Sequence, residues 1–119
     1  MNKEIKEKWV AALRSGKYTQ SKQKLKTKYG YCCLGVLCDL AVKEGICKES
    51  PGEDLHNEEV MFDTRTSILP DSVLRWSEVD SLNPSILIEG KIYPYTLAEC
   101  NDTLELDFNQ IADIIEKQL

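Results

Sequence analysis

Residues 32–45 read CCLGVLCDLAVKEG and form the most apolar stretch of the chain. Within it, apolar side chains recur at helical spacing, at Leu34, Leu37, Cys38 and Ala41. Gly45 follows where a helix of this length usually ends. We therefore predict a buried central helix. Gly35 inside it is a poor helix former, which indicates that a neighbouring element approaches closely there.

Shorter elements are predicted on both sides of this helix. We expect a first helix over residues 2–15, a short helix after Pro70, and a last helix opened by a capping-box pattern at Asp107 and Gln110. The extended segments are a loop or edge hairpin leading to Gly30, a short strand near residues 60–62, and a hairpin that turns at residues 89–90. The predicted fold is a single α+β domain with three to four helices packed on a small antiparallel sheet.

Size and composition agree with one folded domain. The chain has 119 residues, of which 42% are hydrophobic and 29% charged, and this is too apolar for a disordered chain. No apolar run approaches the roughly 20 residues needed to cross a bilayer, and the N-terminus lacks the apolar region of a signal peptide. We expect a soluble cytoplasmic protein without membrane contact.

The charge is unevenly distributed along the chain. The net charge of −5 argues against general nucleic-acid binding, because duplex affinity rests on many Lys and Arg contacts to phosphates. Residues 1–30 hold nine basic and two acidic residues, a net charge of +7, whereas residues 31–119 carry −12. Either the basic segment packs beside the acidic remainder as partly paired surface, or it forms an edge that binds a small anion.

The five cysteines, at positions 32, 33, 38, 47 and 100, are odd in number, and no two have CxxC spacing. This pattern disfavours both a zinc site and a disulfide framework. We expect no metal and predict that the cysteines are small buried hydrophobic residues in a reducing compartment.

The chain offers no recognisable catalytic set. His56 is the only histidine and lies in the polar stretch 46–67, so a Cys–His pair has little support. No phosphate-binding glycine loop is present. Asp39, inside the apolar helix, is expected to make a structural hydrogen bond. Asn101 and Asp102 either hydrogen-bond nearby backbone or face a ligand.

Four motifs give the chain a resemblance to a group of small phage and prophage proteins. They are KWVAALRSGKYTQ from residue 8, YCCLGVLCDL from residue 31, LPDSVLRW from residue 69, and ECNDTLELDFNQIADIIE from residue 99. The resemblance covers nearly the whole chain apart from residues 46–67 and 80–97. Proteins of this size in phages include counter-defence sponges, which hold the nucleotide messengers of bacterial immune systems such as Thoeris and CBASS without chemistry.

By analogy of size, origin and composition, the resemblance implies a non-enzymatic sponge in the host cytoplasm, with no cofactor. Its ligand would be a small anionic nucleotide, of the cyclic ADP-ribose type or a cyclic oligonucleotide. The expected ligand-binding residues are Arg14, Tyr18, Gln20, Tyr31, Asn101 and Asp102.

Each expected ligand contact has a structural alternative. The guanidinium of Arg14 would hold a phosphate, or else pair with a local acid. Tyr18 or Tyr31 would stack on a base, or else cap the core. Gln20, Asn101 and Asp102 would hydrogen-bond hydroxyls or ring nitrogens of the ligand. The alternative for Gln20 is a hydrogen bond to loop backbone.

Two other functions and one assembly state follow from the same sequence. The acidic stretch 49–63 is a candidate for binding a basic protein surface, as an inhibitor or nucleic-acid mimic that engages a host defence enzyme. A small enzyme acting on nucleotides is the third class. We also expect a homo-oligomer, since a chain of this length has little depth in which to enclose a nucleotide.

Overall fold

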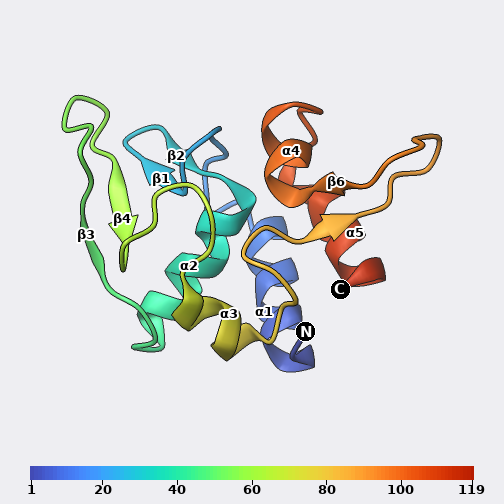
Figure 1. Ribbon diagram of the computed structural model, residues 1–119, viewed down its shortest axis with the longest axis horizontal. Coiled ribbons are helices and arrows are strands. Elements are labelled where there is room, and N and C mark those ends of the chain that lie inside the picture. Colours follow the sequence, from blue (N-terminus) through green and yellow to red (C-terminus); the bar gives the residue numbers. More distant parts are fainter.

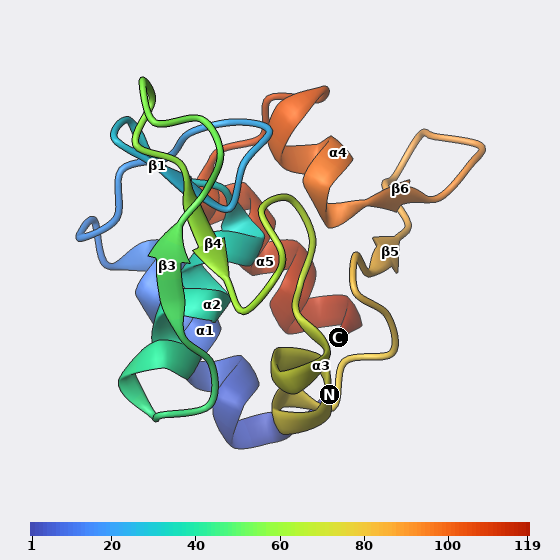
Figure 2. The ribbon, with the colours of Figure 1, turned by 60° about the vertical axis from the view of Figure 1, so that its left-hand side comes forward.

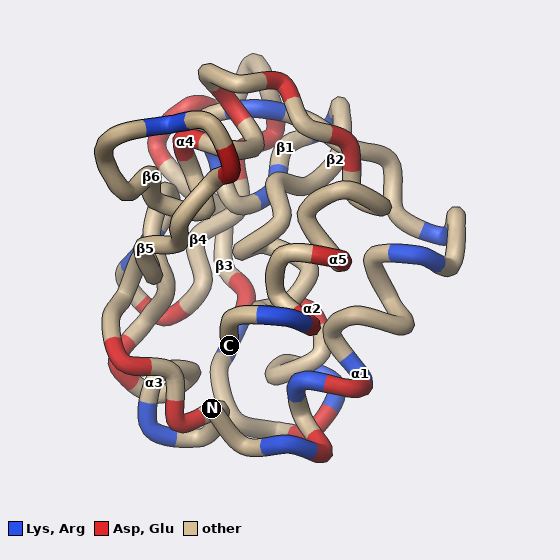
Figure 3. The backbone as a smooth tube through the Cα atoms, turned by 90° about the vertical axis from the view of Figure 1, so that its right-hand side faces the viewer, with Lys and Arg blue, Asp and Glu red and all other residues tan.

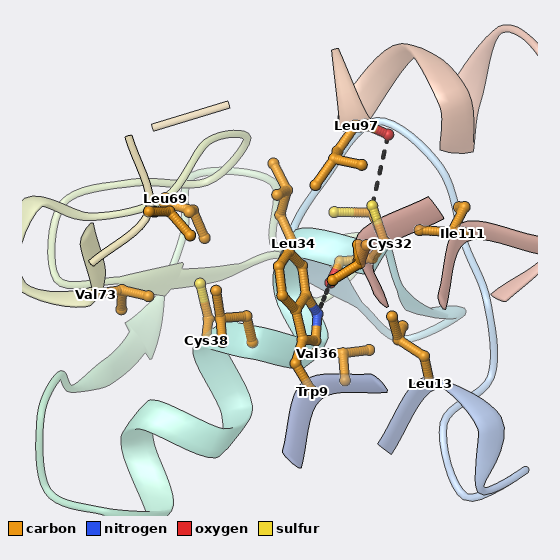
Figure 4. Packing of buried hydrophobic residues seen from close by; sticks show 14 of the residues in the cluster. Trp9, Leu13, Cys32, Leu34, Val36, Cys38, Leu69, Val73, Leu97 and Ile111 are labelled. Carbon is orange, nitrogen blue, oxygen red and sulfur yellow. Dashed lines mark hydrogen bonds between the residues drawn. The ribbon is translucent and has the colours of Figure 1, made fainter. Parts of the chain in front are cut away.

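The predicted central helix is present as α2, Cys33–Lys43, in the computed structural model, which describes residues 1–119. Every residue from Cys33 to Asp39 is buried, so the first two turns of the helix are enclosed on all sides rather than along one stripe. The indole Nε1 of Trp9 donates a hydrogen bond to the carbonyl oxygen of Cys33 at 3.0 Å, and Figure 4 shows this indole among the buried side chains. The polar atom of a fully buried tryptophan is thereby satisfied.

Four further helices and six short strands complete the fold (Figure 1). The helices are α1 (Lys3–Arg14), α3 (Asp71–Ser77), α4 (Leu97–Asp102) and α5 (Phe108–Gln118). The strands pair antiparallel as β1 (Lys26–Thr27) with β2 (Gly30–Tyr31), β3 (Glu49–Pro51) with β4 (Val60–Phe62), and β5 (Ser85–Ile86) with β6 (Tyr95–Thr96). The α+β class is confirmed, but the strands form three separate two-stranded ribbons rather than one sheet.

The two terminal helices, α1 and α5, pack against each other. Both begin and end near the residues predicted from the sequence. α1 buries Ile5, Trp9, Val10 and Leu13, and α5 buries Phe108, Ile111, Ala112 and Ile115. The predicted capping box opens α5: the Asp107 carboxylate accepts from the Gln110 amide at 2.8 Å, and the Gln110 side chain accepts from the Asp107 amide at 2.9 Å.

The close approach predicted at Gly35 is confirmed. A Cβ atom at this position would lie 1.8 Å from the carbonyl oxygen of Leu25. Leu25 is fully buried, its amide donates to the carbonyl of Thr66 at 2.7 Å, and its carbonyl accepts from the amide of Cys32 at 3.3 Å. The segment before β1 therefore crosses directly over the first turn of α2.

One helix was not predicted. Residues 96–102 lack apolar periodicity, yet α4 forms because Thr96 and Glu99 make a second capping box. Asn101 and Asp102, expected in a turn before the last helix, lie instead in the final turn of α4. In Figure 2 the β5–β6 hairpin that leads into α4 projects from the rest of the molecule. None of the helices combines the length and the apolar character that a membrane span requires.

Candidate functional site

Asn101 lies at the junction of three segments that are distant in sequence, and it is only 1% exposed. Its Oδ1 accepts hydrogen bonds from the Gln20 side chain at 2.9 Å and from the Cys33 amide at 3.2 Å. Its Nδ2 donates to the carbonyl of Ser21 and to the carboxylate of Asp102, both at 2.8 Å. All four hydrogen-bonding positions of the amide are thus occupied inside the protein, which leaves Asn101 none to offer a ligand.

Asp102 and Gln20 extend this network. The carboxylate of Asp102 accepts from the amide of Gln23 at 3.0 Å and holds that residue in the left-handed region, with φ 72°. Gln20 donates a second hydrogen bond, to the carbonyl of Leu106 at 2.8 Å, whereas its own Oε1 has no partner in the protein. A cavity of about 230 Å³ lies beside Gln20 and Asn101. Gln20 therefore keeps a free acceptor for a ligand, as does Asp102, whose Oδ2 accepts no hydrogen bond from the protein.

The two expected stacking residues meet. The rings of Tyr18 and Tyr31 lie edge to face with centroids 5.0 Å apart, and both tyrosines are partly exposed. The ammonium of Lys43 lies 5.6 Å from the Tyr18 ring centroid, and that of Lys26 lies 5.2 Å from the Tyr31 ring centroid. We call these four side chains the tyrosine–lysine cluster.

Asp39 anchors the cluster to α2. Its carboxylate accepts a hydrogen bond from the Tyr18 hydroxyl and forms an ion pair with Lys43 at 3.1 Å. Lys43 also donates to the Tyr18 hydroxyl at 3.2 Å. Burial, together with the hydrogen bond to Asp39, raises the pKa of Tyr18 above its ordinary value. Asp39 thus makes the structural hydrogen bond predicted for it.

A parallel bridge between Gln20 and Tyr31 joins the cluster to the Asn101 network. Five of the six expected ligand-binding residues consequently belong to one continuous region. Sequence reasoning missed Lys26 and Lys43. The spacing of Asp39 and Lys43, four residues apart on one helix, was the available signal for Lys43. Nothing in the sequence singles out Lys26 from its neighbouring lysines.

Arg14 is separate from this region, and in the structure it makes the alternative contact expected for it, pairing with acids. Its guanidinium forms a close ion pair with Asp113 and a second one with Glu116 at 2.8 Å, both on α5. The planar fork is therefore already occupied by two carboxylates, and it joins the C-terminal end of α1 to α5.

The same pairing applies to most of the basic segment. Five of its nine basic residues form ion pairs with acids of the remaining chain: Lys8, Arg14, Lys22, Lys24 and Lys26. Figure 3 shows basic and acidic positions interleaved on the face that carries α1 and α5. The interpretation as partly paired surface is thus confirmed, and an anion-binding edge has to rely on a few lysines rather than on the whole segment.

All five cysteines are buried and free, as predicted. Burial raises the pKa of the thiols of Cys32, Cys47 and Cys100 to about 11, and it also raises the pKa of the other two thiols well above the ordinary value. Protonated buried thiols are weak nucleophiles, so these residues pack rather than react. No group of His, Cys, Asp and Glu side chains is arranged to hold a metal ion.

The acidic stretch 49–63 forms the β3–β4 hairpin, at the left of Figure 1. Cavities of about 430 and 650 Å³ adjoin the hairpin, and Glu59 lines both of them. Glu59 is 7% exposed and pairs with Lys24 at 3.5 Å. Sequence reasoning did not single out Glu59 from the other acids, because its burial depends on the fold.

The chain belongs to the family described as a domain of unknown function (DUF8296), whose model matches residues 1–119. No significant match was found among curated proteins or among solved structures.

Proposed function

We propose that the protein binds and sequesters a small anionic nucleotide, of the cyclic ADP-ribose type or a cyclic oligonucleotide, without chemistry. The observation that carries this proposal is the tyrosine–lysine cluster, in which two aromatic rings 5.0 Å apart each have a lysine ammonium within 6 Å. A nucleotide presents the two complementary chemistries, a base that stacks on an aromatic ring and phosphates that attract ammonium groups.

The division of roles follows from which atoms are free. The Tyr31 ring and the Tyr18 ring would provide the stacking surface, displacing the lysine that now lies over each ring. Lys26 and Lys43 would then turn their ammonium groups to the phosphates. The unpartnered Oε1 of Gln20 would accept from a hydroxyl or an exocyclic amine.

Asn101, Asp102 and Arg14 have other tasks in this proposal. The first two hold the loop that carries Gln20, and Arg14 fixes α1 to α5. They support the site from outside it, since the hydrogen-bonding groups they would offer to a ligand are largely engaged within the protein.

The resemblance to phage proteins supplies the biological setting of the proposal, namely removal of an immune messenger in an infected bacterium. Small-molecule sites usually measure roughly 300–1,000 Å³, and the cavity beside Gln20 is smaller, at about 230 Å³. Further residues are therefore needed to enclose a nucleotide. We expect a second copy of the chain to supply them at a symmetric interface.

Isothermal titration calorimetry with a panel of cyclic ADP-ribose isomers and cyclic oligonucleotides tests the proposal. We expect saturable heat with one class of messenger, and recovery of the intact ligand by chromatography after incubation. Tyr31→Ala should abolish or strongly weaken binding. Tyr29→Ala is the matched control, because Lys28 lies 5.3 Å from the Tyr29 ring but no second tyrosine is present.

Three outcomes would contradict the proposal. Absence of heat with every messenger would exclude nucleotide sequestration of these classes. Equal weakening by the two tyrosine variants would exclude the tyrosine–lysine cluster as the site. A chemically altered ligand would instead indicate an enzyme.

A further inference from the structure

The β3–β4 hairpin has features that the nucleotide proposal does not use. The cavity of about 430 Å³ beside it combines three glutamates with an apolar lining that includes Pro51, Leu55 and Val60. We call this cavity the hairpin groove. No basic residue lines it, although Lys24 and Lys26 form ion pairs with two of its glutamates.

Leu55 is a second unusual feature of the hairpin groove. Its side chain is 73% exposed, although it borders the apolar lining. Covering an exposed leucine beside a groove lowers the free energy of the complex, in proportion to the apolar area removed from water. A partner chain that fills the groove would therefore bury Leu55.

Glu59 provides an independent observation. Its side chain is only 7% exposed, and its ion-pair partner, Lys24, lies 3.5 Å away. No protein group donates a hydrogen bond to its carboxylate, whose oxygens instead keep a narrow contact with solvent. Its Oε1 also lies so close to Gly52 that a Cβ atom there would be 2.6 Å from it. A further cation entering the hairpin groove would complete its pairing.

Glu58 and Glu49 extend the acidic character to the rim. Glu58 is exposed and has no ion-pair partner, and Glu49 pairs with Lys26 at 3.3 Å. Carboxylates around an apolar floor fit the side chain of lysine or arginine, whose aliphatic stem packs on apolar surface while its charged end meets acids.

We propose that the hairpin groove docks a basic, apolar segment of a partner protein, with a lysine or arginine directed at Glu58 and Glu59 and an apolar residue against Leu55. The hairpin groove shares no lining residue with the tyrosine–lysine cluster, and the two are linked only by the ion pair between Lys26 and Glu49. Either proposal can therefore fail without the other. The chemistry of the partner follows from charge complementarity with the groove.

A titration monitored by amide chemical shifts tests this inference. The probe is a capped peptide of alternating lysine and leucine, and the comparison peptide has glutamate in place of lysine. We expect saturable shifts confined to residues 49–60 and the neighbouring strand β1 with the basic peptide, and none with the acidic one. The shifts of the remaining chain also report whether each variant is folded.

Three variants separate docking from general attraction to an acidic protein. Leu55→Ser should weaken binding of the basic peptide about fivefold or more, as truncation of a central interface residue does. Glu58→Gln, at the exposed rim, should weaken it about threefold. Glu4→Gln removes an exposed, unpaired acid on α1 and should change affinity less than about twofold.

Several results would overturn the inference. Shifts spread over all acidic surfaces would indicate non-specific attraction, as would equal weakening by Glu58→Gln and Glu4→Gln. If Leu55→Ser left the affinity unchanged, or if spermine competed fully at equal charge concentration, the apolar part of the groove would have no role and a small polycation would be the better ligand.

Discussion

Replacing Asn101 by alanine distinguishes a structural from a ligand-binding amide. The substitution removes the acceptor of the buried Cys33 amide, the donor to the carbonyl of Ser21 and one of two acceptors of Gln20. A buried polar group that loses its partner costs about 1–3 kcal/mol. Gln20 keeps its hydrogen bond to the Leu106 carbonyl, so the loss of its second acceptor adds little to the destabilisation.

The expected loss of stability is therefore dominated by two backbone groups. The Cys33 amide is buried at the first turn of α2, and the Ser21 carbonyl is partly buried. With about 2 kcal/mol for the first group and about 1 kcal/mol for the second, Asn101→Ala should lower the free energy of unfolding by about 3 kcal/mol. This amounts to about 12 °C in the midpoint of thermal unfolding for a domain of this size.

Urea and thermal unfolding, followed by circular dichroism, measure this effect. Asn109→Ala is the matched control, because Asn109 is exposed on α5 and its replacement should change stability by less than about 0.5 kcal/mol. If Asn101→Ala were as stable as the control and lost only ligand binding, the amide would be a ligand contact and the reasoning would be refuted.

Three further outcomes are expected. Gly35→Ala should unfold the protein or lower its expression sharply, because its Cβ would overlap the Leu25 carbonyl; a stable, soluble variant would contradict this packing. The cysteine thiols have a raised pKa when folded, so the unfolded chain releases its thiol protons first as pH rises. Stability to urea should accordingly fall between pH 9 and about 11, and a flat profile would indicate exposed thiols. Arg14→Ala should weaken the α1–α5 contact slightly, with a difference in thermal midpoint that disappears in 1 M salt, and should not affect nucleotide affinity.

Four of the five helices were predictable because their signals are local. The ends of α1 and the capping box of α5 depend on residues within four positions of each other, and the sequence displays them directly. Gly35 was informative for a related reason, since a glycine in an apolar helix has few explanations other than close contact. The capping box at Thr96 is a weak signal, because it follows Pro94 closely and opens a helix of only six residues.

The strands and the site depend on contacts between distant residues. Strands of two or three residues carry almost no periodicity, so whether they join one sheet or three ribbons is decided by what lies beside them. The role of Asn101 could not be predicted from nearby residues either, because its partners are distant in the sequence. Its partners Gln20 and Cys33 are 81 and 68 residues away, and an Asn-Asp pair in isolation is equally compatible with a turn, a cap or a ligand contact.

Three of the four motifs that carry the phage resemblance meet at one point. Gln20 comes from the first motif, Cys33 from the second and Asn101 from the fourth, and hydrogen bonds to the Asn101 amide join them. The Gln20 and Asn101 side chains of the signature are therefore explained by the fold, since a chain lacking either leaves a partly or fully buried polar atom unpaired, whereas Cys33 contributes only its backbone amide. Function has to be sought in motif atoms that the fold leaves free. The rings of Tyr18 and Tyr31 and the Oε1 of Gln20 meet this criterion, whereas the guanidinium of Arg14 does not. Replacing Tyr31 keeps the Asn101 network but removes a ring that packs on Tyr18 and the core, so ligand binding by the variant has to be measured well below its own thermal midpoint to report on function.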